Sequence, residues 1–184
     1  TKVREMTPDD VVVLELSSFQ LMDMQVSPHI AVITNIAPNH LDIHKSYEEY
    51  IDSKKNIFNN QNENDILVIN YDNEITKKFK DEAKGKVIYF SRKCKLDDGI
   101  IYDDGKIKEC KDKVRRHILD VKDVQLRGLH NYENICAAVA ATASLVEPDT
   151  QVKAIERFKG VAHRLELVRE INGVKWYNDS IGTS

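Results

Sequence analysis

Glu15 is a charged residue at the end of a segment that is otherwise apolar. The stretch Val11–Leu16, in which Glu15 is the one polar residue, is rich in β-branched residues and predicts a central parallel strand buried on both faces. A carboxylate at the end of such a strand is costly unless it is paired, protonated or bound to a metal. A lone glutamate there would turn to solvent. Two further stretches supply partners, and because ligands of open α/β sheets bind at the carboxyl ends of the strands, we expect Glu15 to face a ligand.

The first of these stretches is the loop Asn35–His44, which follows a second predicted strand, Ile30–Thr34. The loop contains His40, Asp42 and His44. Imidazole and carboxylate groups serve as acid–base groups and as metal ligands. The two strand ends would open onto the same crevice, so this loop is a candidate for contact with a ligand or a metal.

The second stretch is a predicted helix that contains Lys54. Ser46–Glu49 has the S-x-x-E pattern of a capping box, and the helix should run to about Phe58 or Asn60. Lys54 falls within its apolar stripe, although lysine is rarely buried without a partner. The side chain either extends past its neighbours to solvent or turns inward toward charge in the crevice, and the pattern leaves both open.

The remaining pattern predicts a three-layer α/β fold. Strands at Asp65–Asn70 and Lys86–Phe90, with a charged helix at Asp72–Lys84 between them, imply right-handed parallel crossovers. Two Asp-Asp-Gly turn signals within Ser91–Leu126 predict a small antiparallel β meander at one edge of the sheet.

An alanine-rich helix is predicted at Asn131–Val146. Asn131 and Asn134 lie in its first turn, where free N–H groups favour an anion or a polar ligand. Asn131 could be only the N-cap, which would leave Asn134 unexplained. Another helix should begin at Pro148, with Phe158 among its inward-facing residues.

The last stretch predicts a hairpin, because Leu165–Ile171 and Val174–Tyr177 are joined by an Asn-Gly pair. Arg164 precedes the hairpin and Asp179 follows it. A guanidinium offers paired donors to phosphate oxygens, so Arg164 is a candidate phosphate ligand.

The composition excludes several classes of protein. The 184 residues include 27 basic and 30 acidic side chains, giving a net charge of −3 and no electrostatic case for nucleic acid. No apolar run approaches the ~20 residues of a membrane helix, and no signal peptide is recognisable. The three cysteines lack C-x-x-C spacing, which suits the reducing cytoplasm. The chain begins without Met, and we expect it to be a piece of a longer protein.

Together these motifs resemble the Mur ligases of peptidoglycan synthesis, which join an amino acid to a carboxylate using ATP. The matching elements occur in the family's order: ELSSFQL (15–21), NHLDIH (39–44), Y-x-x-x-K (50–54), GLHNYEN (128–134), HRLE (163–166) and YNDS (177–180). The sequence ELSSFQL is most similar to the branch that adds D-glutamate to UDP-N-acetylmuramoyl-L-alanine.

The resemblance implies a P-loop NTPase-like fold whose first strand and P-loop are missing from this chain. Residues 1–160 would form a central ATP-binding domain, and residues 161–184 a linker and the first hairpin of a C-terminal domain. It further implies a cytoplasmic monomer that uses ATP and two Mg²⁺ ions.

The resemblance also implies roles for individual residues. Glu15 would ligate the magnesium shared with the ATP phosphates, and His40 would hold a second magnesium and contact the substrate. Lys54 matches the lysine that the family carbamylates, which turns an ammonium into a carboxylate suited to magnesium. Ser17 would contact the nucleotide-sugar substrate.

Three further residues would hold ATP by the same resemblance: Asn134, Arg164 and Asp179, with Arg164 near the γ-phosphate. The family's reaction proceeds through an acyl phosphate, which the incoming amine then attacks. Lys54, His40 and Arg164 would be the catalytic residues, because metals and a guanidinium allow two anions to meet.

The sequence departs from the family in three ways. None of its seven glycines belongs to a G-x-x-x-x-G-K-[ST] loop. Ile181 replaces a lysine that many members of this branch have after Asn-Asp-Ser, and the domain that binds the incoming amino acid is missing. We therefore expect residues 1–184 to be inactive by themselves.

Three alternatives remain open from the sequence. One is a related ligase with another acceptor, such as a folylpolyglutamate synthase. Another is a metal-dependent hydrolase built on His40-x-Asp42-x-His44. The third is a non-catalytic binding module, which would not explain why Glu15 and Lys54 occur within apolar segments.

Overall fold

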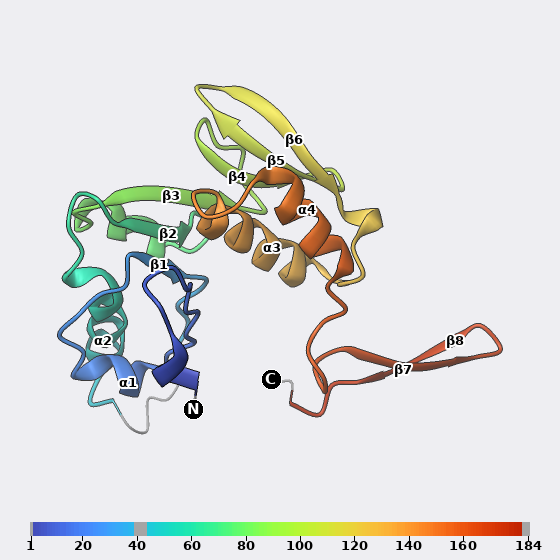
Figure 1. The fold of residues 1–184 in the computed structure, drawn as a ribbon, viewed down its shortest axis with the longest axis horizontal. Coiled ribbons are helices and arrows are strands. Elements are labelled where there is room, and N and C mark those ends of the chain that lie inside the picture. The colour runs from blue at the N-terminus through green and yellow to red at the C-terminus, as the bar shows by residue number, and fades with distance from the viewer. Residues whose placement is uncertain (1, 39–43, 182–184) are drawn as a thin grey trace.

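A computed structural model describes residues 2–38 and 44–181. A six-stranded sheet in the order β1-β2-β3-β4-β5-β6 dominates it (Figure 1). β1 to β4 run parallel, and β4, β5 and β6 form an antiparallel meander at one edge. The strands are β1 Ile30–Ile33, β2 Ile66–Asn70, β3 Lys86–Ser91, β4 Gly99–Asp103, β5 Lys106–Lys111 and β6 Val114–Asp120.

Helices connect the parallel strands and cover the sheet. The α-helices are α1 Ser18–Met22, α2 Tyr47–Asn59, α3 Leu129–Thr142 and α4 Pro148–Arg157, and the 3-10 helices are η1 Lys2–Glu5, η2 Thr76–Asp81 and η3 Val121–Asp123. α2 connects β1 to β2 and η2 connects β2 to β3, as parallel crossovers require.

Two hydrophobic cores lie on opposite faces of the sheet, and β2 contributes to both. Val68 packs into the core beneath α3 and α4, whereas Leu67 and Ile69 pack against α2 and η2. This alternation follows from the two-residue period of a strand. The arrangement confirms the predicted three-layer α/β fold with a mainly parallel sheet and a small meander.

Local signals placed several elements correctly. The Ser46 hydroxyl accepts the Glu49 N–H (3.2 Å) at the start of α2, as predicted, although the Glu49 carboxylate accepts the Lys45 N–H (2.6 Å) and not that of Ser46. The capping box is therefore only half formed. A capping serine still stabilises a helix start by about 1 kcal/mol.

The predicted strand at residues 11–16 is wrong. This segment has no regular secondary structure, and Val13 is 89% exposed. A strand buried on both faces needs neighbours to pair its backbone groups. β1 pairs only with β2, and no strand in the described parts of the chain pairs with residues 11–16.

The helix predicted at Asp72–Lys84 is reduced to η2 because polar side chains near its start compete for the backbone. The Asn73 carboxamide oxygen accepts the N–H groups of Ile75 (3.1 Å) and Thr76 (3.0 Å), and the Thr76 hydroxyl donates to the Asn70 carbonyl (2.6 Å). Such bonds offer the backbone an alternative to the α-helix.

Two residues of the last helices also differ from expectation. Gly128, at φ +98°, and not Asn131, is the N-cap of α3, and the Asn131 side chain instead donates to the Arg127 carbonyl (2.7 Å). Phe158 is 47% exposed because it follows the end of α4 with extended backbone angles and so leaves the apolar face of that helix.

The predicted hairpin forms a separate two-stranded sheet, β7 Glu166–Ile171 and β8 Val174–Asn178. Asn172 and Gly173 both have positive φ (50° and 79°), as the tight turn between twisted strands requires. Figure 1 shows this hairpin projecting away from α4 and from the main sheet.

Candidate functional site

A cavity of about 330 Å³ opens at the carboxyl end of β1. Its walls come from the segment before α1, from α1, from the end of β1 and from α2. The lining residues are Leu14, Glu15, Leu16, Leu21, Val32, Ile33, Thr34, Asn35, Lys54 and Ile57. The carboxylate and the lysine that the sequence singled out therefore line the same cavity, although Glu15 reaches it from an irregular segment and not from a strand.

Lys54 is half-buried on the face of α2 that packs toward the sheet. Its ammonium lies 5.8 Å from the centre of the Tyr50 ring. Burial lowers the pKa of Lys54, and the nearby Glu15 carboxylate partly opposes this shift. The structure thus favours the inward orientation over extension to solvent. A lowered pKa increases the fraction of the neutral amine, which is the nucleophilic form of lysine.

The donor set of the cavity suits a hard cation only in part. Glu15 supplies a carboxylate, and Thr34 and Asn35 supply further oxygen atoms, which are the ligands that Mg²⁺ prefers. A protonated Lys54 would repel a cation, whereas a carbamylated one would attract it. Within residues 2–38 and 44–181, no group of three or more His, Cys, Asp or Glu could hold a metal. His40 and Asp42 lie outside the described residues.

His44 is buried and joins α1 to α2. Its Nε2 lies 2.9 Å from the Ser18 hydroxyl, and its ring stacks on Phe19 and meets the Tyr50 ring edge-on. Its Nδ1 has no hydrogen-bond partner among the described residues. His44 therefore packs as a structural residue beside the Lys54 helix.

Ser17 is the N-cap of α1. Its hydroxyl accepts the Gln20 N–H (3.4 Å), and the Gln20 side chain accepts the Ser17 N–H (2.9 Å), forming a capping box. Ser17 is exposed beside the cavity-lining segment. Its observed role is to fix the start of α1.

A polar network at the carboxyl ends of β1 and β2 was not anticipated from the sequence. Asn70, only 2% exposed, donates to the Thr34 carbonyl (2.9 Å) and to the Glu133 carboxylate (2.9 Å). Glu133 also pairs with the Arg92 guanidinium (3.4 Å). The available signal was Asn70 itself, a polar residue that ends an apolar strand as Glu15 ends its apolar run.

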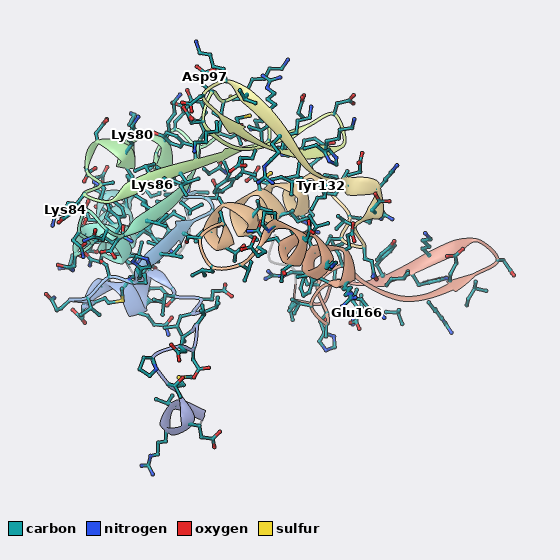
Figure 2. All side chains as sticks on the ribbon, turned by 45° about the horizontal axis from the view of Figure 1, so that its top comes forward. Lys80, Lys84, Lys86, Asp97, Tyr132 and Glu166 are labelled. Atoms are coloured by element: carbon teal, nitrogen blue, oxygen red, sulfur yellow. The ribbon has the colours of Figure 1, made fainter. Side chains whose placement is uncertain are left out.

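Asn134 follows Glu133 in the first turns of α3 and is exposed. Tyr132, two residues before Asn134 on this helix, stacks on Tyr102 of β4 with ring centres 5.4 Å apart, and Figure 2 shows Tyr132 where α3 lies next to the meander. The start of α3 is thus held both to β4 and, through Glu133, to β2.

Arg164 and Asp179 lie together at the base of the β7–β8 hairpin. The Asp179 carboxylate accepts the Leu165 N–H (3.0 Å), and Arg164 is exposed. Glu166, labelled in Figure 2, marks this base. The hairpin lies apart from α1 and α2 (Figure 1), so the structure does not bring Arg164 and Asp179 to the cavity.

Comparison with known protein families shows to which family this chain belongs. The family model described as the Mur ligase middle domain matches residues 2–142. The chain belongs to the Mur ligase family. Its matched region contains the cavity, Glu15, Lys54 and Asn134, whereas Arg164 and Asp179 lie beyond it.

A curated relative from Ruminiclostridium cellulolyticum, UDP-N-acetylmuramoylalanine–D-glutamate ligase, is 53% identical over all 184 residues. The chain spans 40% of the length of that relative. The resemblance of the sequence motifs to those of the Mur ligases is confirmed.

Solved Mur ligases share the fold. MurF from Acinetobacter baumannii matches with a TM-score of 0.65 and 19% identity over 88% of this chain and 35% of its own. MurF from Thermotoga maritima, solved in complex with ADP, matches with a TM-score of 0.55 and 21% identity over 83% of this chain and 35% of its own. At these identities the likeness supports the fold alone.

Among the described residues, no helix has both the length and the apolar character needed to cross a bilayer.

Proposed function

We propose that this chain is part of an ATP-dependent ligase that adds D-glutamate to UDP-N-acetylmuramoyl-L-alanine. The observation that carries the ligase chemistry is the cavity at the carboxyl end of β1, which Lys54 and Glu15 both line. The choice of D-glutamate is supported by the name of the relative that is 53% identical over the whole chain. The use of ATP is carried over from the Mur ligase family, to which the chain belongs.

Lys54 suits carbamylation because of its surroundings. Burial lowers its pKa and so increases the fraction of neutral amine. That amine would add to CO₂, forming an N–C bond and releasing one proton, and the product is an anionic carbamate. Together with Glu15 and His40 it would hold two Mg²⁺ ions, which would supply charge neutralisation for the phosphates when bound.

The proposed reaction has two steps. A carboxylate oxygen of the UDP-sugar substrate attacks the γ-phosphorus of ATP, and ADP leaves with the bonding electrons. The amine of D-glutamate then attacks the acyl carbon, phosphate leaves, and the amine loses a proton. In this scheme Asn134 and Asp179 bind ATP, Arg164 binds the γ-phosphate, and Ser17 contacts the substrate.

This scheme requires the base of the hairpin to approach the cavity. Neither Arg164 nor Asp179 lines the cavity in the structure. Domain closure around substrates is a common way to complete a catalytic site, and we propose that the 158–165 connection moves on nucleotide binding. The proposed ligase acts as a cytoplasmic monomer.

The test is replacement of Lys54 in the full-length enzyme. Lys54→Ala should lower turnover by about 10²-fold or more, the scale of a lost metal-site or acid–base group. Small carboxylates in solution should restore part of it. Lys55→Ala is the matched control, because Lys55 does not line the cavity and its ammonium pairs instead with Glu82 (2.8 Å), so turnover should be nearly unchanged. Full activity of Lys54→Ala would remove Lys54 from the mechanism.

A further inference from the structure

Glu133 links two parts of the proposed site: the start of α3, which carries Asn134, and the cavity that Lys54 lines. It lies on α3 directly before Asn134, and its carboxylate points to the sheet and not to solvent, with 21% of the side chain exposed. One oxygen accepts the Asn70 amide (2.9 Å), and the other lies 3.4 Å from the Arg92 Nε. Its hydrogen-bonding capacity is therefore directed toward the protein.

Asn70 connects Glu133 to the wall of the cavity. The same Asn70 amide nitrogen donates to the Thr34 carbonyl (2.9 Å), and its oxygen accepts the Asp72 N–H (2.8 Å). Thr34 lines the cavity together with Lys54. A chain of two hydrogen bonds thus runs from the first turns of α3 to the carboxyl end of β1.

The charge of Glu133 also needs a partner at this place. An unpaired carboxylate next to a residue that binds ATP would repel the polyphosphate, and at close range such repulsion is weakly screened. Arg92, at the carboxyl end of β3, offsets this charge.

We infer that Glu133 is a positioning residue for nucleotide binding, which rests on the proposed function. Its bond to Asn70 fixes the rotation and depth of the start of α3 against β1 and β2. Asn134 is thereby presented outward, in a fixed relation to the cavity of Lys54. Glu133 itself touches neither ATP nor substrate in this assignment.

The experiment compares Glu133 variants in the full-length enzyme. We measure the Kd for ATP by equilibrium binding, and the KM for ATP and kcat by phosphate release. Glu133→Ala should raise both Kd and KM about tenfold, the scale of one lost charge-assisted hydrogen bond. Glu133→Gln keeps an acceptor for the Asn70 amide and should stay within about threefold of wild type. The melting temperature of each variant is recorded alongside.

Glu147→Ala is the matched control. Glu147 is exposed before α4 and its side chain makes no capping hydrogen bond, so ATP binding should be unchanged. If Glu133→Ala does not fold, Glu133→Asp decides the question, because the shorter carboxylate keeps the charge but draws back from Asn70. It should weaken ATP binding without loss of folding.

The inference is overturned if Glu133→Ala, or the folded Glu133→Asp, binds ATP like wild type. The inference is also overturned if Glu133→Gln binds ATP as weakly as Glu133→Ala, because the charge of Glu133 and not its hydrogen bond to Asn70 would then determine ATP binding. A lower melting temperature with unchanged Kd and KM would assign Glu133 a purely structural role. Absence of wild-type turnover with D-glutamate would reject the proposed function, while the ATP-binding comparison still decides the role of Glu133.

Discussion

Replacing Asn70 by Ala should destabilise the fold more than the small change in side-chain volume suggests. Three hydrogen bonds are lost: those to the Thr34 carbonyl, the Glu133 carboxylate and the Asp72 N–H. Neutral bonds are worth about 1 kcal/mol each, and a bond to a charged group about 2 kcal/mol. Since the partners are only partly buried, water recovers some of this. We expect the free energy of unfolding to fall by about 3 kcal/mol, and Tm by about 6–12 °C for a chain of this size.

Urea unfolding and a thermal scan measure this loss directly. The slope m should not change, so that the shift in midpoint reports stability. Asn59→Ala is the control, because Asn59 makes one exposed side-chain hydrogen bond to Asn56 (3.1 Å) and should cost less than about 0.5 kcal/mol. A loss below about 1 kcal/mol for Asn70→Ala, or equal losses for the two variants, would refute the reasoning from the network.

Three other predictions concern packing, pH and completeness of the chain. Phe58→Ala should lower the free energy of unfolding in urea by about 3–5 kcal/mol, because Phe58 is 1% exposed. Phe158→Ala, at a residue that is 47% exposed, should lower it by less than about 1 kcal/mol. Equal losses for the two variants would contradict the difference in burial. The Asn62 N–H and His29 hold the pKa of Asp65 below its ordinary value. This carboxylate therefore stabilises the fold above about pH 4 and loses that contribution as the pH falls through its lowered pKa. In a plot of Tm against pH, Asp65→Asn should therefore show a smaller fall in Tm at acid pH than wild type. The same fall in Tm for both proteins would contradict this role of Asp65. Residues 1–184 alone should release no phosphate from ATP with D-glutamate, and measurable release would show that the cavity suffices.

Much of the fold was predictable because its signals are local. Ser46 at the start of α2, the apolar run of β2 and the Asn-Gly turn at 172–173 each act within a few residues. Local chemistry of this kind fixes where elements begin and turn. The position of Lys54 within the apolar stripe of α2 also followed from helical periodicity, whereas the inward direction of its side chain did not.

What the sequence did not reveal depends on long-range partners. The apolar run at 11–16 predicts burial, but apolarity does not say which strand should pair with it, and no described strand does. Asn70 and Glu133 are 63 residues apart in sequence, so their bond follows only from the docking of α3 on β2. The sequence predicted that Glu15 and Lys54 would face the same crevice. It did not predict that Glu15 would lie on an irregular segment instead of a strand.

The most direct test of the proposed function is phosphate release by the full-length protein with Mg-ATP and UDP-N-acetylmuramoyl-L-alanine. D-glutamate is supplied first, and L-glutamate, D-alanine, lysine and meso-diaminopimelate follow in separate reactions. We expect turnover with D-glutamate and none with the other four acceptors. Turnover with a different acceptor, or with no acceptor at all, would contradict it.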